Sequence, residues 1–352
     1  MLAAAGLLVT ILVATGVTLA VLHYESRTNT QQVNLRSGVT IAEDSAIVQA
    51  AARARPAVVS LVTLVTQQQP ALSRGSGYLA TTDGYIVTSI SVIAGAGGMT
   101  VLIQNDAKTH EARLIDYDCQ TGVAVVKIDK VGGLPTLAFA DPTALVQGQR
   151  TVAVGGPFDG GSVTPGYVSA MHRVVSVPNP SATTESIELS DVIQTSAPID
   201  AGTAGGPLLN VGGQVIGIAM QSQPSAGIKG FGLNVADVQD DVQQILQTGQ
   251  VVVSSLGATS TDLSPELASL SGLPAGSQLV NVDKGGPAAS AGLQTGDVIT
   301  QLDDVKLDPA HPLRLLLRSR FHPNQRVTVS YTRAGASTQT QLTLSSQHPS
   351  CS

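Results

Sequence analysis

The sequence predicts a mainly β protein with more than one domain and one N-terminal transmembrane helix. Glycine occurs 36 times among many valines and threonines, a composition typical of short strands joined by tight turns. The 352 residues are enough for two or more domains, and 43% of them are hydrophobic, so each domain can bury a core. The helix is predicted from an apolar run at the N-terminus.

That run extends from Leu2 to Leu22 without a charged residue and is rich in Leu, Val and Ala. A helix of this length crosses a hydrocarbon core of about 30 Å. A cleaved signal peptide is the alternative, but its apolar region has about 7–15 residues and ends at a small-x-small site. The end of the run, Leu22 before His23, is a poor site of that kind. We therefore expect an uncleaved anchor over residues 1–22.

Net charge and cysteine content limit which partners, disulfides and cofactors the sequence predicts. The net charge is −6 and only 12% of residues are charged, with no basic stripe, so we expect no nucleic-acid partner. Cys119 and Cys351 are the two cysteines. A bridge between them stays open as an alternative, because no framework of further cysteines supports it. No group of metal ligands stands out, and no metal or other cofactor is expected.

Four separated blocks of the chain carry motifs in a recognisable order. They are residues 75–96 (GSGYLATTDGYIVTSISVIAGA), 114–129 (LIDYDCQTGVAVVKID), 191–210 (DVIQTSAPIDAGTAGGPLLN) and 213–218 (GQVIGI). Together the blocks resemble the HtrA (DegP-like) family, in which a trypsin-like protease domain precedes one or more PDZ domains. Four blocks in one order are far more specific than a lone short motif. The resemblance covers roughly residues 47–345 and implies a chymotrypsin-like double β-barrel followed by a PDZ domain.

The resemblance also implies the domain boundaries. A short helix with Ile47, Ala50 and Ala51 on one face should open the protease-like domain and end before Pro56, because proline disfavours helix at the residue before it. The expected segments are the anchor (1–22), a polar linker (23–43), the trypsin-like domain (44–248), the PDZ domain (252–345) and a polar tail (346–352).

Three motif positions of the resemblance carry unexpected residues. The family motif Thr-Asn-x-His-Val corresponds to residues 88–92, which places Ser91 at the position of the general base. The motif Thr-Asp-Leu-Ala-Val corresponds to residues 121–125 and places Gly122 at the position of the orienting acid. The nucleophile loop Gly-x-Ser-Gly-Gly-Pro corresponds to residues 202–207 and places Ala204 at the nucleophile.

These replacements predict that the chain is not an enzyme. In a serine protease the hydroxyl attacks, the imidazole moves its proton and the carboxylate orients the imidazole. Ser91, Gly122 and Ala204 cannot perform these tasks, so the sequence predicts a pseudoprotease. The alternative is an atypical endopeptidase that uses other residues. Thr203 or Ser91 would then attack, but neither has a recognisable activator, and no histidine lies in a catalytic motif (His23, His110, His172, His311, His322 and His348).

The loop around the nucleophile position still contains glycines that shape an oxyanion hole in the family. These vestigial loop residues are Gly202, Thr203, Ala204 and Gly205. A peptide carbonyl could dock there, but the preferred interpretation is that the glycines keep the turn geometry, since glycine tolerates positive φ. Asp200 beside them is interpreted as a solvated loop acid.

The PDZ-like region contains a peptide-binding loop and a helical leucine stripe. The family's Tyr-Leu-Gly-Val loop corresponds to Ser255, Leu256, Gly257 and Ala258, whose backbone amides would hold a C-terminal carboxylate. The spacing of Leu313, Leu316 and Leu317 places them on one helical face, where core packing is preferred over a pocket wall. The nearby arginines could favour acidic tails, although a solvated face is the simpler interpretation (Arg314, Arg318 and Arg320).

The resemblance implies a body on the extracytoplasmic side. The absence of Lys or Arg before the anchor, with Arg27 and Arg36 after it, weakly opposes this orientation. We expect a membrane-anchored scaffold or regulatory subunit whose PDZ domain holds C-terminal tails or loops of membrane or exported proteins. A holdase-type chaperone for unfolded clients is the alternative binding function. The oligomeric state stays open, because no aromatic residue lies between Tyr24 and Tyr78 to support family-type trimers.

Overall fold

The computed structural model describes residues 42–65, 71–179, 186–220, 230–308, 311–349 and 351. The expected anchor (1–22) and nearly all of the linker (23–43) lie outside the described residues. No helix within the described ranges has the length and apolar character needed to cross a bilayer. The chain divides after Asp44 into two units, and the description below concerns the unit that begins at Ser45.

The helix expected before the first strand is present. Helix α2 (Ala42–Ala54) is followed by a single 3₁₀ turn (Arg55–Ala57) that contains Pro56. Ile47, Ala50 and Ala51 are buried, as their spacing predicts. The prediction that Pro56 ends the α-helix is therefore confirmed.

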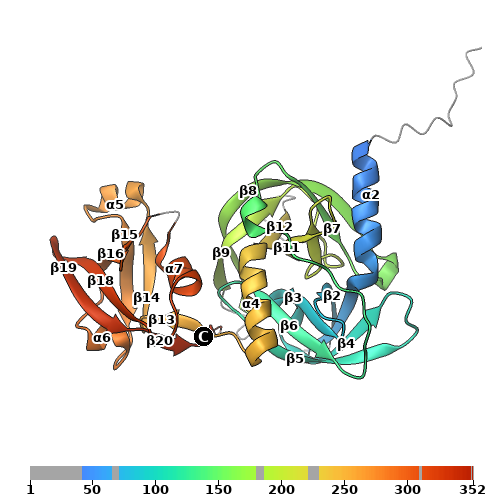
Figure 1. Cartoon of the computed structure of the whole chain (residues 1–352), viewed down its shortest axis with the longest axis horizontal. Helices are drawn as coiled ribbons and strands as arrows, with labels where there is room; N and C mark the ends of the chain where they lie inside the picture. Colours follow the sequence, from blue (N-terminus) through green and yellow to red (C-terminus); the bar gives the residue numbers. More distant parts are fainter. Residues whose placement is uncertain are drawn as a thin grey trace, which may run out of the picture. The chain divides into compact units, whose positions relative to one another are not determined.

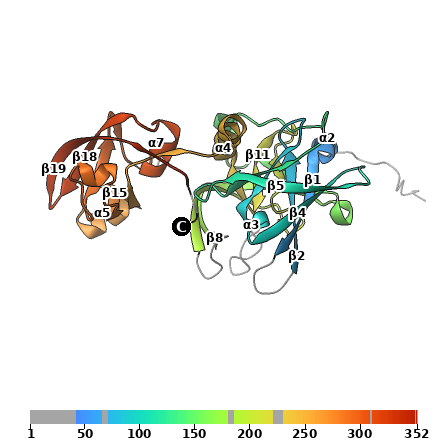
Figure 2. The same ribbon diagram turned by 90° about the horizontal axis from the view of Figure 1, so that it is seen from below.

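The first β-barrel is closed and entirely antiparallel, in the strand order β1-β2-β3-β6-β5-β4. The short helix α3 (Ile90–Ile93) connects β3 to β4 and lies beside the barrel (Figure 2). Every residue of β6 is buried, so this strand is central to the core. The strands are β1 (Val58–Val65), β2 (Ala71–Leu79), β3 (Tyr85–Ser89), β4 (Ala96–Ile103), β5 (Thr109–Tyr117) and β6 (Val123–Ile128).

The second barrel has the same closed form, in the order β10-β11-β12-β9-β8-β7. Two 3₁₀ turns, Pro142–Ala144 and Phe158–Gly160, flank β7. The strands are β7 (Arg150–Val154), β8 (Val163–Pro178), β9 (Ser186–Thr195), β10 (Pro207–Leu209), β11 (Val215–Met220) and β12 (Gly230–Asn234). Together the barrels confirm the expected double-barrel architecture (Figure 1).

Helix α4 (Val235–Thr248) follows the second barrel and packs on β11, β12 and β6. Asn234 caps it by accepting a hydrogen bond from the amide of Ala236, and Gly249 ends it in the left-handed conformation. Three apolar residues at helical spacing are buried, namely Val238, Val242 and Ile245, whereas Leu246 is 38% exposed.

The PDZ domain contains an antiparallel sheet in the order β14-β15-β16-β18-β19, with β17 paired to β16. Its strands are β14 (Ala258–Leu263), β15 (Gly276–Val282), β16 (Val298–Leu302), β17 (Val305–Lys306), β18 (Arg326–Arg333) and β19 (Ala336–Thr343). Its helices are α5 (Pro265–Ser271), α6 (Pro287–Ser290) and α7 (Leu313–Ser319). A separate two-stranded sheet joins β13 (Val253–Ser255) to β20 (Ser345–Gln347).

Candidate functional site

The nucleophile loop is a closed turn in this structure. The carbonyl of Asp200 accepts the amides of Thr203 at 3.2 Å and Ala204 at 2.9 Å. A serine protease aims the amide at the nucleophile position toward the developing oxyanion. Here that amide, on Ala204, is hydrogen-bonded inside the turn. A substrate carbonyl can reach it only when the 200–204 turn opens.

Side chains reinforce the same turn. Asp200 Oδ1 accepts the Thr203 amide at 2.8 Å and the Thr203 hydroxyl at 3.0 Å, and that hydroxyl in turn accepts the Asp200 amide at 2.9 Å. Thr203 has no exposed surface. Asp200 is exposed, as expected of a loop acid, but its carboxylate holds the turn. The Thr203 hydroxyl is structural in this conformation.

Ser76 on β2 ties the turn to both barrels, and the sequence motifs did not single it out. Its hydroxyl donates to the carbonyl of Gly202 at 2.6 Å and accepts the amide of Gly156 at 2.7 Å. Its own amide donates to the carbonyl of Ala204 at 2.7 Å. The only sequence signal was its place in the Gly75-Ser76-Gly77 motif.

The structure brings the three positions that the sequence motifs predict for the triad into one region. Gly122 accepts the amide of Ile90, in α3, at 2.8 Å. Ser91 follows Ile90 in α3, is exposed, and its hydroxyl lies 2.8 Å from that of Ser89. Val92 packs against the loop, because a Cβ built on Gly205 would lie 2.7 Å from its Cγ2.

Gly122 occupies a position that resists a side chain. Its φ is +83°, a backbone conformation that favours glycine. A Cβ built there would lie 2.8 Å from Leu189 Cδ1 and 3.2 Å from Leu233 Cδ2. The space that an orienting carboxylate would need is filled by the second barrel's core.

A pocket of about 450 Å³ opens beside the same loop. The Arg74 guanidinium lies over the Phe158 ring at 4.2 Å on its wall, a cation–π contact. The pocket can receive an extended chain segment next to the turn. Its lining combines backbone of four glycines with polar and apolar side chains (Ser60, Leu61, Val62, Arg74, Gly75, Gly156, Phe158, Gly161, Ser162, Asp200, Ala201 and Gly202).

The PDZ peptide loop is preformed. Gly257 has φ +67°, and its amide donates to Ser255 Oγ at 3.0 Å. Leu256 is buried, and its carbonyl accepts the amide of Ala288 at 2.8 Å. Ala258, the last residue of the loop, begins edge strand β14.

The leucines of α7 belong mainly to the domain core. Leu313 and Leu316 are 2% and 4% exposed, and Leu317 is partly buried against the same cluster. The arginines of this segment differ from one another. Arg320 is half-exposed beside Asp304, as a solvated face predicts, but the Arg318 side chain is only 2% exposed. Both sequence-based interpretations of Arg318 are wrong, because it pairs with buried aspartates of the protease-like domain.

Comparisons with known proteins agree with the fold. A family model described as a trypsin-like peptidase domain matches residues 75–218, and a PDZ domain model matches residues 215–344. A probable periplasmic serine endoprotease DegP-like from Halomonas elongata is 36% identical over 75% of this chain and 54% of its own length. The serine protease Do-like HtrA of Lactococcus lactis is 33% identical over 78% of this chain and 71% of its own length.

Solved structures show the same likeness. The HtrA-type protease AlgW with a tripeptide superposes with a TM-score of 0.69 at 31% identity, over 86% of this chain and 98% of that one. The serine endoprotease from Yersinia pestis gives a TM-score of 0.63 at 27% identity, over 86% of this chain and 98% of that one. The chain spans about half the length of several curated relatives, as the 54% covered in the Halomonas protein illustrates.

The comparisons contradict the prediction that the chain is not an enzyme. Its curated relatives are named serine endoproteases, from Halomonas to Lactococcus, and the trypsin-like peptidase model matches across the nucleophile loop. That prediction rested on three positions, whereas the relatives match this chain over about three quarters of its length. The identity and coverage of these matches show that the chain belongs to the HtrA family of trypsin-like serine proteases with PDZ domains.

Proposed function

We propose that this HtrA-family protein binds extended segments of membrane or exported proteins and holds their C-terminal ends in its PDZ domain. The observation that carries the proposal is the free edge of β14. Among the described strands, β14 pairs only with β15 and ends the sheet order. PDZ domains bind by adding a peptide strand to such an edge.

The neighbouring loop supplies the place for a carboxylate. The left-handed Gly257 turns the chain directly into β14, so the loop amides and the strand edge are continuous. Four successive residues of β14 are exposed and polar (Thr259, Ser260, Thr261 and Asp262). The AlgW structures with a tripeptide and a decapeptide support peptide binding in this fold.

Ser255 tunes this loop. Its hydroxyl already accepts the Gly257 amide, one of the donors that a carboxylate would use. An incoming carboxylate must displace this hydroxyl, which lowers affinity. Ser255→Ala should therefore tighten the binding of carboxylate-terminated peptides.

We also propose an extracytoplasmic body, tethered by residues 2–22. Curated relatives are named periplasmic, which supports the side of the membrane. A tethered peptide-binding body suits a scaffold or regulatory subunit for envelope proteins. A holdase for unfolded clients would instead use the pocket of about 450 Å³ beside the 200–204 turn.

Proteolysis is the second candidate function, favoured by the names of the relatives. Prolonged digestion of unfolded casein by the full chain, together with fluorophosphonate labelling, measures it directly. Casein cleavage that Thr203→Val and Ser91→Ala abolish would identify a hydroxyl outside the family's nucleophile position.

Fluorescence anisotropy with a library of labelled decapeptides tests the binding proposal. Each peptide is compared with its own C-terminally amidated form, a control that changes only the carboxylate. We expect amidation to weaken binding at least about tenfold, or about 1.4 kcal/mol. Equal binding of both forms, or no binding by any peptide, would refute PDZ capture of chain ends.

A further inference from the structure

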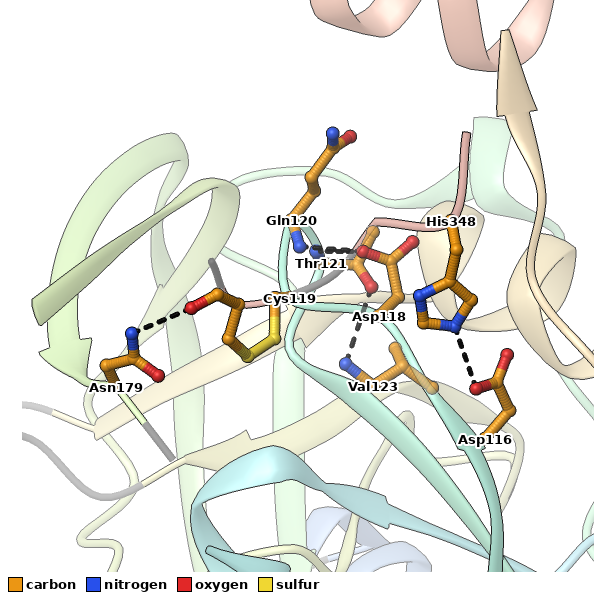
Figure 3. The surroundings of a disulfide bond; sticks show 9 residues. Asp116, Asp118, Cys119, Gln120, Thr121, Val123, Asn179 and His348 are labelled. Atoms are coloured by element: carbon orange, nitrogen blue, oxygen red, sulfur yellow. Dashed lines mark hydrogen bonds and ion pairs between the residues drawn. A yellow bond between two sulfur atoms is a disulfide. The ribbon is translucent and has the colours of Figure 1, made fainter. Parts of the chain in front are cut away.

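The C-terminal tail runs from the PDZ domain to the protease-like domain and is bonded there. Strand β20 (Ser345–Gln347) pairs with β13, which follows the inter-domain linker. Beyond it, Cys351 forms a disulfide with Cys119, 232 residues earlier in the chain (Figure 3). Cys119 lies in the turn between β5 and β6, so the bond joins the end of the chain to the first barrel.

Hydrogen bonds hold the tail residues that precede Cys351. His348 Nε2 lies 2.8 Å from Asp116 Oδ1 (Figure 3), and the other oxygen of Asp116 accepts the amide of Val251 at 2.6 Å. The Cys119 amide donates to the carbonyl of Pro349 at 2.9 Å. Asp116 thus binds the tail and the linker at once.

The same turn receives a second contact from the PDZ domain. The Arg318 guanidinium donates to Asp118 Oδ2 at 2.6 Å and to Asp241 Oδ1. Asp237 lies 3.6 Å from Arg318 Nε. Asp118 and Asp241 have no exposed surface, and the Arg318 side chain is 2% exposed. Helix α7 is therefore fixed to the β5–β6 turn and to α4 by buried charge.

We propose that the tail, residues 345–349 together with Cys351, is a thiol-sensitive clasp that fixes the PDZ domain on the β5–β6 turn. A paired strand of three residues has little stability alone. The disulfide keeps it in place by preventing the tail from leaving. A dithiol opens the clasp: Cys119 and Cys351 each gain a proton and an electron, and the two dithiol sulfurs join in a disulfide.

Burial sets how the clasp opens. Cys119 and Cys351 are 5% and 6% exposed, so a reductant reaches the sulfurs only after the tail lifts. His348 helps to hold the tail, through Asp116 and through an edge-on contact with the Tyr117 ring at 6.0 Å. Removing the imidazole should therefore speed reduction.

Hydrogen exchange of the full chain, with and without dithiothreitol, tests the clasp. We expect reduction to speed exchange at the Val251 and Cys119 amides at least tenfold, while β6 and β11 keep their protection. The double variant Cys119→Ser, Cys351→Ser is the matched control. Its amides should exchange as fast as those of the reduced protein, and dithiothreitol should not change these rates. Reduction of the native protein keeps the test valid if that variant fails to fold.

A second readout is the rate of reduction by dithiothreitol, followed by alkylation and intact mass. His348→Ala should raise this rate several-fold. Three results would overturn the clasp: no disulfide in the purified protein, unchanged exchange at Val251 after reduction, or an equal loss of protection in the barrel strands. Neither assay contains a peptide, so both can be interpreted even if the proposal of peptide binding fails.

Discussion

Replacing Arg318 by methionine should lower the free energy of unfolding by about 3–5 kcal/mol, because it leaves buried carboxylates without a counter-charge. Asp118 and Asp241 are fully buried, and Asp237 is 5% exposed. Methionine fills much of the volume of the arginine stem, so packing changes little and the loss is mainly electrostatic. Neighbouring hydrogen bonds cannot replace the guanidinium, although the Thr121 hydroxyl donates to Asp241 at 2.6 Å.

Arg320→Met is the matched control. Arg320 lies two residues further along and pairs with Asp304, but the side chains are 51% and 75% exposed. Solvent screens such pairs, so we expect a loss of only about 0–1 kcal/mol. The two variants remove the same group from one segment, and the sites differ in burial and in the number of partner carboxylates.

Urea unfolding followed by circular dichroism gives both losses, compared at equal slopes of free energy against urea. Adding Asp118→Asn and Asp241→Asn to Arg318→Met should recover part of the loss, because neutral amides no longer need a counter-charge. Similar losses for Arg318→Met and Arg320→Met would refute the reasoning. No recovery in the triple variant would refute the electrostatic origin of the loss.

Three further predictions concern pH and the turns around the site. Burial raises the pKa of Asp237 from 3.8 to about 6, so the folded chain binds this proton more tightly and stability falls as pH rises through that window. In Asp237→Asn, the fall in the free energy of unfolding between pH 4 and pH 7 should be about 2–3 kcal/mol smaller than in the native chain, as measured by urea unfolding at both pH values. An equal fall in both proteins would contradict this prediction. Gly122→Asp should cost about 1–3 kcal/mol, because an L side chain is strained there and meets Leu189, and a neutral effect on the thermal midpoint would disprove this. Thr203→Val should cost about 1–3 kcal/mol by leaving the Asp200 amide unpaired, and should speed amide exchange at residues 200–204; unaltered exchange would show that other contacts hold the turn.

The double barrel and the PDZ domain could be predicted because four blocks of the sequence resemble the HtrA family and occur in the family's order. Gly205 has φ +82°, and the motif that identified the loop contains the glycine this turn requires. The buried face of helix α4 follows the helical spacing of its apolar residues, and the structure adds that Asn234 and Gly249 stand at its two ends.

The contacts between distant segments could not be predicted. The separation of Cys119 and Cys351 along the chain says nothing about their separation in space, so the bridge stayed open until the fold placed their Cα atoms 5.2 Å apart. The partners of Arg318 could not be predicted from the sequence either. A helical arginine next to exposed neighbours predicts a solvated face, and only the fold shows the aspartates, 77 and 200 residues away, that it meets.

The turn between β5 and β6 contains Gly122, which belongs to a sequence motif, and also Asp118 and Cys119, which contact distant segments of the chain. Asp118 receives Arg318, and Cys119 receives the tail. Gly122 in the same turn accepts the Ile90 amide, at the start of the helix whose Val92 lies against Gly205. These contacts lie within five consecutive residues, so the contacts that hold the PDZ domain and the carbonyl that accepts the first amide of α3 belong to one short turn. The absence of space for a side chain at Gly122 also concerns packing: a Cβ there would lie 2.8 Å from Leu189 Cδ1, so a larger residue would have to displace part of the second barrel's core.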